Sequence, residues 1–436
     1  MLRRDTGLVL LAGLCLLAAF VTLGACGPPL GSPSYLVLVG VAAAAYGSAM
    51  CILFITRRPP AGAFLILCLV LAAACRVPLL MKESGNDVKR YLWDARAQQF
   101  GYNPYLVVPA DPMLARVHTE QTRRVTDATM TTPYPPGAQI LFRLIFSVSA
   151  RTYAFKMVLT LCELAFCVVL WRWLAATGLA AGWLIAYAWN PLAILETAGE
   201  AHLDLIGVLF LMASVLFLTN GRRRSSVLCF AVSVAIKPLP IVLVPLFWRR
   251  VSARDAATGA ALFMAMYVPF FHGGHFPAGS IGTFIDQFRF NQTVFGVTSD
   301  LVGARAAAAL AVAGGLVVAV ALRSRTSVTS PSAWAWPMAV ALVMAPVVYP
   351  WYLVWLTPFL TSLATLPLLV WSLSILSTYV VWHLQALGGP WTVPTSIAFF
   401  EFGLVVLAGA AAAGVWQIRA RRARTPVHKW TVPPAG

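Results

Sequence analysis

The sequence is poor in charge, and acidic residues are the scarcer of its charged side chains. Aspartate and glutamate together number 15 in 436 residues, and charged residues of both signs make up only 11% of the chain. Hydrophobic residues make up 60%, and the mean hydropathy is +0.78. A soluble core could not bury that much apolar surface, and apolar runs long enough to cross a bilayer recur along the chain. The composition therefore predicts an integral membrane protein.

Cysteines in paired spacing are also missing. The eight cysteines lie within or at the edge of apolar runs, at Cys15, Cys26, Cys51, Cys68, Cys75, Cys162, Cys167 and Cys229. They are typical of small buried hydrophobic residues and predict neither a zinc site nor a disulfide framework. The first apolar run also lacks a small-residue cleavage pattern followed by a soluble domain, which argues against a secretory signal.

Basic residues outnumber acidic ones, and their positions indicate membrane topology rather than nucleic-acid binding. The formal net charge is +17. Basic clusters separate the apolar runs at Arg3-Arg4, Arg57-Arg58, Arg222 to Arg224, Arg249-Arg250, Arg323 with Arg325, and Arg419 to Arg424. Lysine and arginine are retained on the cytoplasmic side of membranes. With the first cluster inside, alternating spans place all the clusters and both termini in the cytoplasm.

We predict an all-α polytopic membrane protein with about twelve transmembrane helices and one re-entrant helical hairpin. The predicted spans are 7–26, 35–56, 61–81, 153–174, 178–195, 203–219, 254–271, 301–322, 332–349, 351–366, 367–384 and 398–418. Arginines flank residues 225–248 on both sides, so a single straight span would place one flank outside. Pro238 and Pro240 break this run, which favours two short halves that enter and leave on the cytoplasmic side.

One large polar segment, residues 82–152, is predicted to lie outside as a catalytic loop with interfacial helices. It carries six of the fifteen acidic residues, and its basic residues depart from the charge rule, which phosphate binding would explain. The other predicted parts are the first three helices at 1–81, a core at 153–271 that includes the hairpin, a second outer loop at 272–300, C-terminal helices at 301–418, and a basic cytoplasmic tail at 419–436.

The outer segment opens with NDVKRYLWDARAQQFGYNPY, residues 86–105. Gly85-Asn86 favours a helix start and Gly101 a stop, so we expect a short helix in the membrane interface. One face of that helix would carry Asp87, Arg90, Tyr91 and Asp94. A solvated ion-pair ladder is the alternative, but a carboxylate beside a membrane span is costly unless it is paired or used.

Five sequence blocks occur in order over roughly residues 80–360. They are DVKRYLWDARAQQFGYNPY, TPYPPGAQILF, NPLAILETAGEAHLD, AIKPLPIVLVPLFW and YPWYLVWLTP. Together they resemble the GT-C superfamily of membrane glycosyltransferases, most closely the bacterial polyprenyl-phosphate-mannose-dependent mannosyltransferases. The resemblance implies a GT-C-like fold, a sugar donor linked to a lipid phosphate, and inversion at the anomeric carbon. It also implies a catalytic base early in the first large outer loop, where the matching residue is Asp87.

The residue types suit that chemistry. An acceptor hydroxyl must lose its proton as it attacks, so we expect one carboxylate as general base, either Asp87 or its rival Asp94. The leaving lipid phosphate gains charge and needs cations preset around it. Arg90, Lys237 and Arg289 are the candidates, although Arg90 could instead orient the carboxylate and Lys237 could pair with freed carbonyls.

We expect further side chains to contact the sugar or the acceptor. The candidates are Tyr91, Trp93, Asn103, Tyr105, Tyr134, Glu200, His202, Asp204, Tyr349, Trp351 and Tyr352. His202 and Asp204 match the family pattern G-N-G-H-x-D, whereas Glu200 and Ala201 depart from it. These residues could instead form a structural hydrogen-bond network or bind a divalent metal, although we expect no cofactor. The last three aromatic residues could also form an interfacial aromatic belt.

These observations together predict an inverting hexosyltransferase of the cell membrane. It would move a sugar, expected to be mannose, from a polyprenyl-phosphate carrier to a glycolipid or glycan hydroxyl on the outer face, with no nucleic-acid partner. Glucose, arabinose and aminoarabinose are the alternative sugars. A lipid or solute transporter is the competing class, but polar residues concentrated on one face and the lack of an internal repeat disfavour it.

Overall fold

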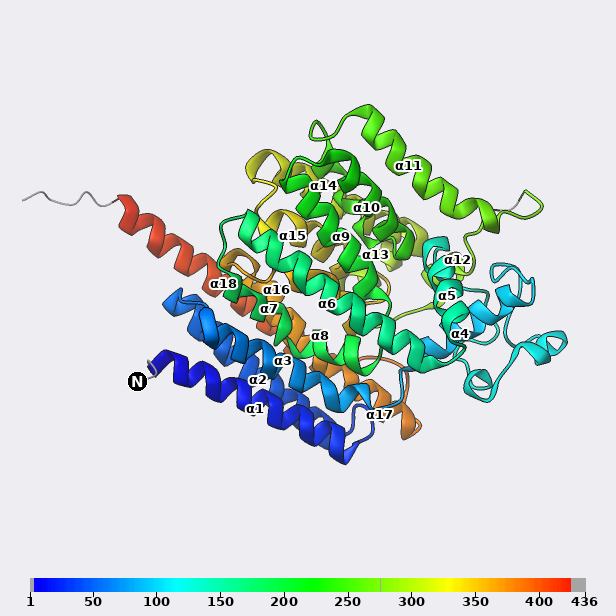
Figure 1. The fold of residues 1–436 in the computed structure, drawn as a ribbon, viewed down its shortest axis with the longest axis horizontal. Coiled ribbons are helices and arrows are strands. Elements are labelled where there is room, and N and C mark those ends of the chain that lie inside the picture. The colour runs from blue at the N-terminus through cyan, green and yellow to red at the C-terminus, as the bar shows by residue number, and fades with distance from the viewer. Residues whose placement is uncertain (1–3, 275, 425–436) are drawn as a thin grey trace, which may run out of the picture.

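The computed structural model describes residues 4–274 and 276–424, and every regular element in that part of the chain is a helix (Figure 1). Arg3 and residues 425–436 of the predicted tail lie outside the described residues. The main chain of the preceding residues, up to Arg424, continues the last helix, so the first part of the predicted tail is helical. The all-α prediction is therefore confirmed for the described part of the chain.

Seven helices of this part are long and apolar enough to cross a membrane. They are α1 (Arg4–Cys26), α2 (Pro33–Thr56), α3 (Gly62–Leu80), α6 (Thr152–Ala176), α14 (Ala304–Arg325), the run Leu363–Ala386, and α18 (Thr395–Arg424, apolar to Ile418). Each coincides with a predicted span. Large apolar side chains stay exposed along α1, α3, α14 and α18, as is expected where a helix surface meets lipid. The structure thus supports an integral membrane protein.

Five predicted spans do not form long helices. Residues 203–219 form α9 (Asp204–Thr219), which becomes an eighth span only if Pro191–Gly199 is joined to it across a bend of 119°. The other four are built from the shorter elements η3 (Ala181–Leu184), α7 (Ile185–Ala188), α8 (Pro191–Ile194), α11 (Ala253–Tyr267), η6 (Val268–Phe270), α15 (Pro331–Val343), η7 (Pro350–Phe359) and η8 (Leu363–Thr365). Prolines interrupt most of these stretches, because each removes a helical hydrogen bond. The structure thus has seven or eight long apolar helices, against twelve predicted.

The run Leu363–Ala386 is itself assembled from short pieces. After η8 it contains α16 (Leu366–Ser374), η9 (Ile375–Tyr379) and α17 (Val380–Ala386). Most residues of its apolar stretch are buried inside the protein, whereas almost none of the apolar residues of α18 are buried. The central part of the molecule is therefore made of irregular, buried helices, and the long regular helices lie around it.

The segment 225–248 folds back on itself. It comprises α10 (Arg223–Ile236) and η5 (Leu239–Phe247), and Lys237 between them has an extended backbone. The carbonyl oxygen of Trp248 accepts a hydrogen bond from Nε of Arg323, at the C-terminal end of α14 (3.0 Å). Arg223 in turn lies close enough to Asp255 to interact electrostatically. The start of the segment therefore lies near Asp255, seven residues beyond its end, and Lys237 lies between its two halves.

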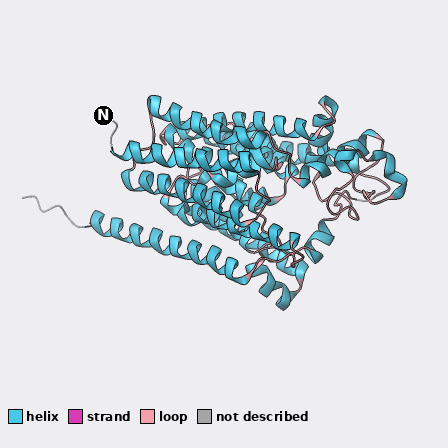
Figure 2. Ribbon diagram, turned by 90° about the horizontal axis from the view of Figure 1, so that it is seen from below, coloured by secondary structure: helices cyan, strands magenta, loops and turns pink. Residues whose placement is uncertain are grey.

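Residues 82–151 form a lobe at one end of the helical bundle, away from the N-terminus (Figures 1 and 2). Its elements are α4 (Asn86–Gln99), η1 (Pro112–Val117), η2 (Glu120–Thr122) and α5 (Pro136–Val148). Trp93 and Leu114 belong to a small hydrophobic cluster inside the lobe. Two further helices, α12 (Ile281–Gln287) and α13 (Thr293–Val302), lie in the second predicted outer loop. Ser280 connects that loop to the lobe by donating its hydroxyl to the carbonyl oxygen of Thr131 (2.9 Å).

Charged side chains inside the bundle have partners. Arg76 on α3 pairs with Glu163 on α6 at 2.8 Å, and the Tyr187 hydroxyl donates to the same carboxylate. Glu401 on α18 is fully buried and accepts hydrogen bonds from Asn291 and Trp371. These contacts satisfy polar groups that a bilayer would not solvate.

The eight cysteines are free, as predicted, but they are not all buried. Cys68 and Cys75 on α3 are buried, whereas Cys15, Cys26 and Cys51 are exposed on the surface of α1 and α2. Exposure on a lipid-facing surface is as favourable for an apolar thiol as burial between helices. The prediction of buried cysteines is therefore wrong for these three residues.

Candidate active site

A cavity of about 480 Å³ lies where the lobe meets the bundle. Its polar lining includes Asn86, Asp87, Arg90, Asp127, Tyr134 and Lys237. Its aromatic lining includes Tyr349, Trp351, Tyr352, Trp355, Trp382 and Trp391, and its apolar wall includes Ile281, Phe284, Ile285, Phe288, Leu342 and Val347. One cavity thus combines charged groups, aromatic rings and an apolar wall, which suits a ligand with a polar head and an apolar chain.

The position of Asp87 follows from how α4 begins. The backbone N–H of Gly85 donates to the carbonyl oxygen of Glu200 (3.2 Å), and a Cβ at Gly85 would lie 2.5 Å from a carboxylate oxygen of Glu200. Because glycine has no Cβ, the start of α4 packs directly against Glu200. Asp87 follows in the first turn of α4, and its side chain is 30% exposed in the cavity lining.

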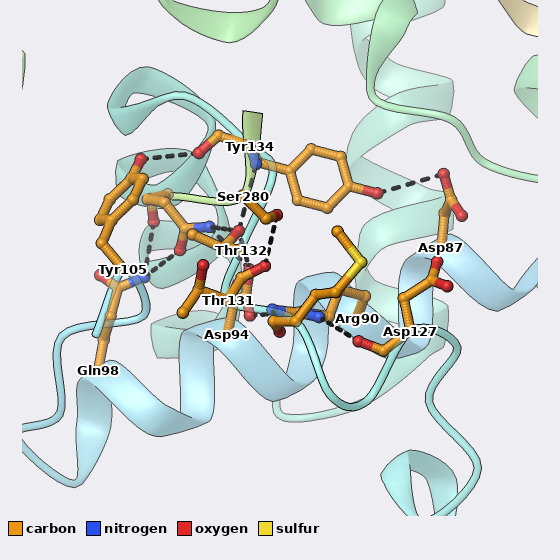
Figure 3. A network of polar contacts seen from close by, with 12 residues as sticks. Asp87, Arg90, Asp94, Gln98, Tyr105, Asp127, Thr131, Thr132, Tyr134 and Ser280 are labelled. Atoms are coloured by element: carbon orange, nitrogen blue, oxygen red, sulfur yellow. Dashed lines mark hydrogen bonds and ion pairs between the residues drawn. The ribbon is translucent and has the colours of Figure 1, made fainter. Parts of the chain in front are cut away.

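Tyr134 donates its hydroxyl to Oδ2 of Asp87 over 3.2 Å (Figure 3). Burial, together with the neighbouring Asp87 carboxylate, raises the pKa of Tyr134 well above its ordinary value. The phenol therefore stays protonated at neutral pH and acts as a donor. This hydrogen bond orients the carboxylate of Asp87 from the lobe side.

Asp94, the predicted rival base, is fully buried and lies outside the cavity lining. Its oxygens accept hydrogen bonds from Arg90 Nε (2.9 Å), the Thr132 hydroxyl (2.6 Å) and the Gln139 amide (2.7 Å) (Figure 3). Asp87 and Asp94 share one face of α4, as expected, but one carboxylate meets the cavity and the other meets the interior of the lobe. The geometry favours Asp87 as the group that meets a substrate.

Arg90 lines the cavity, but its guanidinium is largely engaged by the protein. Besides Asp94, it donates to the carbonyl oxygens of Asp127 (3.4 Å) and Met130 (3.1 Å). These contacts hold the loop 126–130 against α4 (Figure 3). The ion-pair partner of Arg90 is Asp94 rather than Asp87, so its contacts stabilise the lobe.

Lys237 reaches the cavity from the apex between α10 and η5. Its ammonium donates to both carboxylate oxygens of Asp204, at 2.6 and 2.7 Å, and lies 4.3 Å from the ring centre of Tyr352. Trp355 donates its indole N–H to the same carboxylate (2.7 Å). The side chain of Lys237 is 18% exposed, so this paired cation still faces the cavity.

His202 stands beside Asp87. Its Nε2 lies 3.7 Å from Oδ2 of Asp87, and its Nδ1 lies 2.7 Å from Oε2 of Glu196. The ring stacks on Trp351, with centres 4.2 Å apart and planes inclined by 11°. The Tyr379 hydroxyl donates to Oε1 of Glu196. His202 was among the site residues predicted from the sequence, whereas Glu196, which contacts it, and Tyr379, which contacts Glu196, were not.

Several predicted contacts lie away from the cavity lining. Trp93 and Tyr91 are fully buried, the former in the lobe cluster and the latter stacked on Phe142. The Asn103 side chain donates to the carbonyl oxygen of Phe270, and the Tyr105 hydroxyl donates to that of Tyr134. These side chains stabilise the lobe and its contacts with the bundle. Their positions indicate an indirect role, without contact to a substrate.

Arg289 and Glu200 are also absent from the cavity lining. The Arg289 guanidinium donates to the carbonyl oxygens of Ile285, Asp286 and Phe288, which belong to its own segment. Glu200 packs against Gly85 at the start of α4. Their geometry favours structural roles over contact with donor or acceptor.

Sequence reasoning missed Asp127. It lies in the lobe loop with a left-handed backbone (φ 52°), and its side chain lines the cavity beside Asp87 (Figure 3). Partial burial and the Asp87 carboxylate raise the pKa of Asp127. No repeat or motif marks this residue, and only the folded loop brings it within range of Asp87, 40 positions earlier.

The described residues offer no set of ligands for the divalent metal considered as an alternative. Among the described residues, no group of three or more histidine, cysteine, aspartate or glutamate side chains is arranged to hold a metal ion. His202 and Asp204, the proposed ligands, instead contact Glu196 and Lys237. The hydrogen-bond network is therefore the interpretation that matches their positions.

Comparison with known proteins agrees with these features. Residues 36–252 match the model of a family described as "Alpha-(1->6)-mannopyranosyltransferase, N-terminal domain". The match includes α4, the lobe, His202 and Lys237. No curated protein and no solved structure matches the chain.

Proposed function

Residues 36–252 match the model of the alpha-(1->6)-mannopyranosyltransferase family, and from this match we propose that the protein transfers mannose from a polyprenyl-phosphate carrier to an acceptor hydroxyl. The observation that carries the proposal is the position of Asp87. Its carboxylate is partly exposed in a cavity whose other lining includes a cation and an apolar wall. Such a cavity suits a sugar joined through phosphate to a long hydrocarbon chain.

In the proposed reaction, Asp87 acts as general base. The acceptor oxygen attacks the anomeric carbon while its proton passes to Asp87, and the bond from that carbon to the phosphate oxygen breaks. A single displacement with one base inverts the configuration. Asp94 is a positioning residue in this scheme, because it is buried and holds Arg90, Thr132 and Gln139.

The leaving phosphate is proposed to sit near Lys237. An ammonium has three hydrogen-bond donors, and Asp204 accepts two of them. The third is available to a phosphate oxygen, whose growing charge it would stabilise during bond cleavage. Arg90 supports the site indirectly by holding the loop 126–130, and Arg289 takes no part.

The hydrocarbon chain of the carrier is proposed to lie along α12. This short helix and the strand-like segment near Val347 supply the apolar wall, with Ile281, Phe284 and Phe288 on one side and Leu342 on the other. Asp127, on the polar side, is proposed to accept hydrogen bonds from sugar hydroxyls. Tyr349 and Trp351 offer aromatic faces for stacking on a sugar ring.

We propose that the lobe faces the outer side of the membrane, with both termini in the cytoplasm. The support is the distribution of charge. The arginine clusters that bound α10 and η5 lie at the ends of the segment whose apex carries Lys237, and the lobe lies at the apex side. In this arrangement 225–248 is a re-entrant hairpin, and the short helices contribute the remaining crossings.

The test is turnover of a short-chain polyprenyl-phosphate mannose with a radiolabelled sugar, using a crude membrane glycolipid extract as acceptor. We expect the wild-type protein to transfer label and Asp87→Asn to lose at least about 10²-fold in kcat while it still binds the donor. Asp111→Asn is the matched control, because that carboxylate is in the lobe but outside the cavity lining.

Three results would change the proposal. Full activity of Asp87→Asn would remove the general base. Transfer from the glucose, arabinose or aminoarabinose carrier instead of the mannose carrier would change the donor sugar. Specific binding of a carrier without transfer to any acceptor, for wild type and variant alike, would favour a transporter.

A further inference from the structure

Three residues form a continuous line from the proposed base into the protein. Asp87 contacts Nε2 of His202, and Nδ1 of His202 contacts Glu196. The histidine is nearly buried, and Glu196 is fully buried. The two ring nitrogens thus each face a carboxylate, one in the cavity and one in the interior.

The backbone between Glu196 and His202 has an unusual conformation that brings the two side chains together. Leu195–Gly199 form a π-helix, and the backbone N–H of His202 donates to the carbonyl oxygen of Glu196 (2.9 Å). Ala201 between them has a left-handed backbone (φ 60°), which is strained for a residue with a Cβ. Short π-helices and strained residues occur mainly at functional sites. Here they turn the chain so that His202 returns over Glu196.

The charges around His202 favour a proton on each ring nitrogen. The titratable groups that face it are Asp87 on α4, Glu196 in the π-helix Leu195–Gly199, Glu200 in the next turn and Asp204 on α9. Lys156 faces Glu200, and Lys237 faces Asp204. Four carboxylates and only two ammonium groups therefore lie around His202. A neutral imidazole would leave Asp87 and Glu196 without a nearby positive charge, whereas an imidazolium places its charge beside both carboxylates.

We propose that His202 is a positioning residue: held beside Glu196, its imidazolium is the ionic partner of Oδ2 of Asp87, 3.7 Å away, and so fixes the base with Oδ1 turned to the acceptor hydroxyl. Both described contacts of Asp87, with Tyr134 and with His202, fall on Oδ2, and no described residue donates a hydrogen bond to Oδ1. The inference rests on the proposed function, because it assigns a task only if Asp87 is the base.

The proton balance of the step leaves His202 unchanged. The acceptor O–H bond breaks and its proton goes to Oδ1 of Asp87, while the new bond forms at the anomeric carbon. The electron pair of the broken carbon–oxygen bond stays on the lipid phosphate. That phosphate then takes the proton from Asp87 as it leaves, which returns the base to its ionised form. Trp351, stacked on the imidazole, keeps the ring in plane throughout.

Two variants test the proposal through the pH dependence of kcat, measured with the labelled donor. Glu196→Gln removes the carboxylate that holds the proton on Nδ1. We expect the alkaline limb of the wild-type profile, where His202 loses its proton, to move to lower pH by about one unit or more in this variant. His202→Gln should lower kcat by about 10²-fold or more, with that limb absent and the donor Kd changed less than threefold.

Other outcomes would overturn it. If either variant kept wild-type kcat and an unmoved limb, His202 would have no positioning role. A uniform fall of kcat at every pH, with the limb unmoved in Glu196→Gln, would show a merely structural role. Thermal unfolding in detergent and donor binding establish that the variants fold. Tyr379→Phe removes a hydrogen-bond donor from Glu196 but keeps its charge, so the alkaline limb should not move to lower pH in this variant.

The failure of this inference is distinguishable from failure of the proposed function. If wild-type protein transfers no sugar from any carrier, the proposed function fails. If wild type is active and Asp87→Asn is inactive while the His202 and Glu196 variants behave as wild type, only the inference fails.

Discussion

At the scale of single residues, the two aspartates of α4 show how one helical face divides between two environments. Asp87 and Asp94 are two turns apart, yet one is partly exposed in the cavity and the other is fully buried. The buried carboxylate has three hydrogen-bond donors, which offset its loss of hydration. Asp94 fixes the position of Arg90, which in turn holds the loop 126–130.

Asp127 gives a prediction about pH. Because its pKa is raised, its carboxylate takes up a proton at higher pH than an ordinary aspartate, and binding of sugar hydroxyls should weaken as the pH falls through the mildly acidic range. Asp127→Asn should raise the acceptor KM about tenfold and remove this acidic dependence. Asparagine tolerates the left-handed backbone, so folding should be kept. The measurement is steady-state kinetics from about pH 5 to 8, a range that lies around and between the ordinary pKa values of carboxyl groups and histidine.

Gly85 gives a second prediction. In Gly85→Ala, the added Cβ would meet the carboxylate of Glu200 at 2.5 Å and its carbonyl oxygen at 3.2 Å, so the Glu200 side chain and the start of α4 must shift relative to one another. We expect kcat to fall by about tenfold or more, since displacements of about 1 Å can cost 10²-fold, with donor affinity less affected. Gly101→Ala or Gly62→Ala would disturb only a turn. Unchanged kcat in Gly85→Ala would show that this contact does not set the position of Asp87.

At the scale of elements, the sequence identified α4 and its limits but not what surrounds it. The predicted helix between Gly85 and Gly101 is present as Asn86–Gln99, because its start and stop signals are local. Tyr91 and Trp93 were expected in the site since they are aromatic and adjacent to Asp87. Helical periodicity alone cannot tell the face that meets the cavity from the face that meets α5, so both residues turned out to be buried packing residues.

Membrane spans were predicted well only where the chain forms regular helices. Hydropathy located α1, α2, α3, α6, α14 and α18, because each is long and uninterrupted. Between residues 331 and 379, apolar side chains continue but prolines convert the chain into short helices, and hydropathy does not distinguish these from spans. Contacts such as Glu196 with His202 depend on a π-helix, for which the sequence carries no recognised signal.

The apolar wall on α12 leads to a third prediction. Phe284→Ala and Ile281→Ala together remove side chains proposed to contact the hydrocarbon chain of the donor. We expect the KM for a long-chain polyprenyl donor to rise about tenfold or more, since each lost side chain is worth about 1.5–3 kcal/mol of apolar burial, while a donor with a very short chain is unaffected. Equal effects on both donors would place the chain elsewhere.

The ion pair between α3 and α6 gives a fourth prediction, on stability. Arg76 and Glu163 are both largely buried, and Arg76 also donates to the carbonyl oxygens of Ala72 and Ala188. Glu163→Gln would leave a buried guanidinium without its counter-ion, which typically destabilises by about 3–5 kcal/mol. Thermal unfolding in detergent should show a clear decrease in Tm, and a Tm equal to that of wild type would contradict this role.

At the scale of the whole molecule, the chain is a bundle with a polar lobe on one end, and the cavity lies at their junction (Figures 1 and 2). Three stretches far apart in sequence supply the proposed machinery, namely the start of α4, the turn before α9 and the apex at Lys237. All three lie in the family-matched residues 36–252, whereas the aromatic and apolar lining comes largely from later residues.

Topology gives a fifth prediction. If the lobe faces outward, a cysteine introduced at Asp111 should react with a membrane-impermeant thiol reagent in intact cells, whereas one at Asn220, between α9 and α10, should react only after permeabilisation. The native cysteines are in apolar helices, and a background without them gives a cleaner signal. Labelling of both positions from outside would contradict the proposed orientation.

Arg90 holds the loop 126–130 through its main-chain carbonyl oxygens, at Asp127 and Met130, rather than through side chains. Main-chain anchors are the same whatever residues the loop carries. The loop can therefore change its sequence while its path beside Asp87 is kept, provided that position 127 holds a residue that tolerates the left-handed backbone. Exchanging residues 126–130 is for that reason a direct route to a transferase that accepts a different hydroxyl yet keeps the same base.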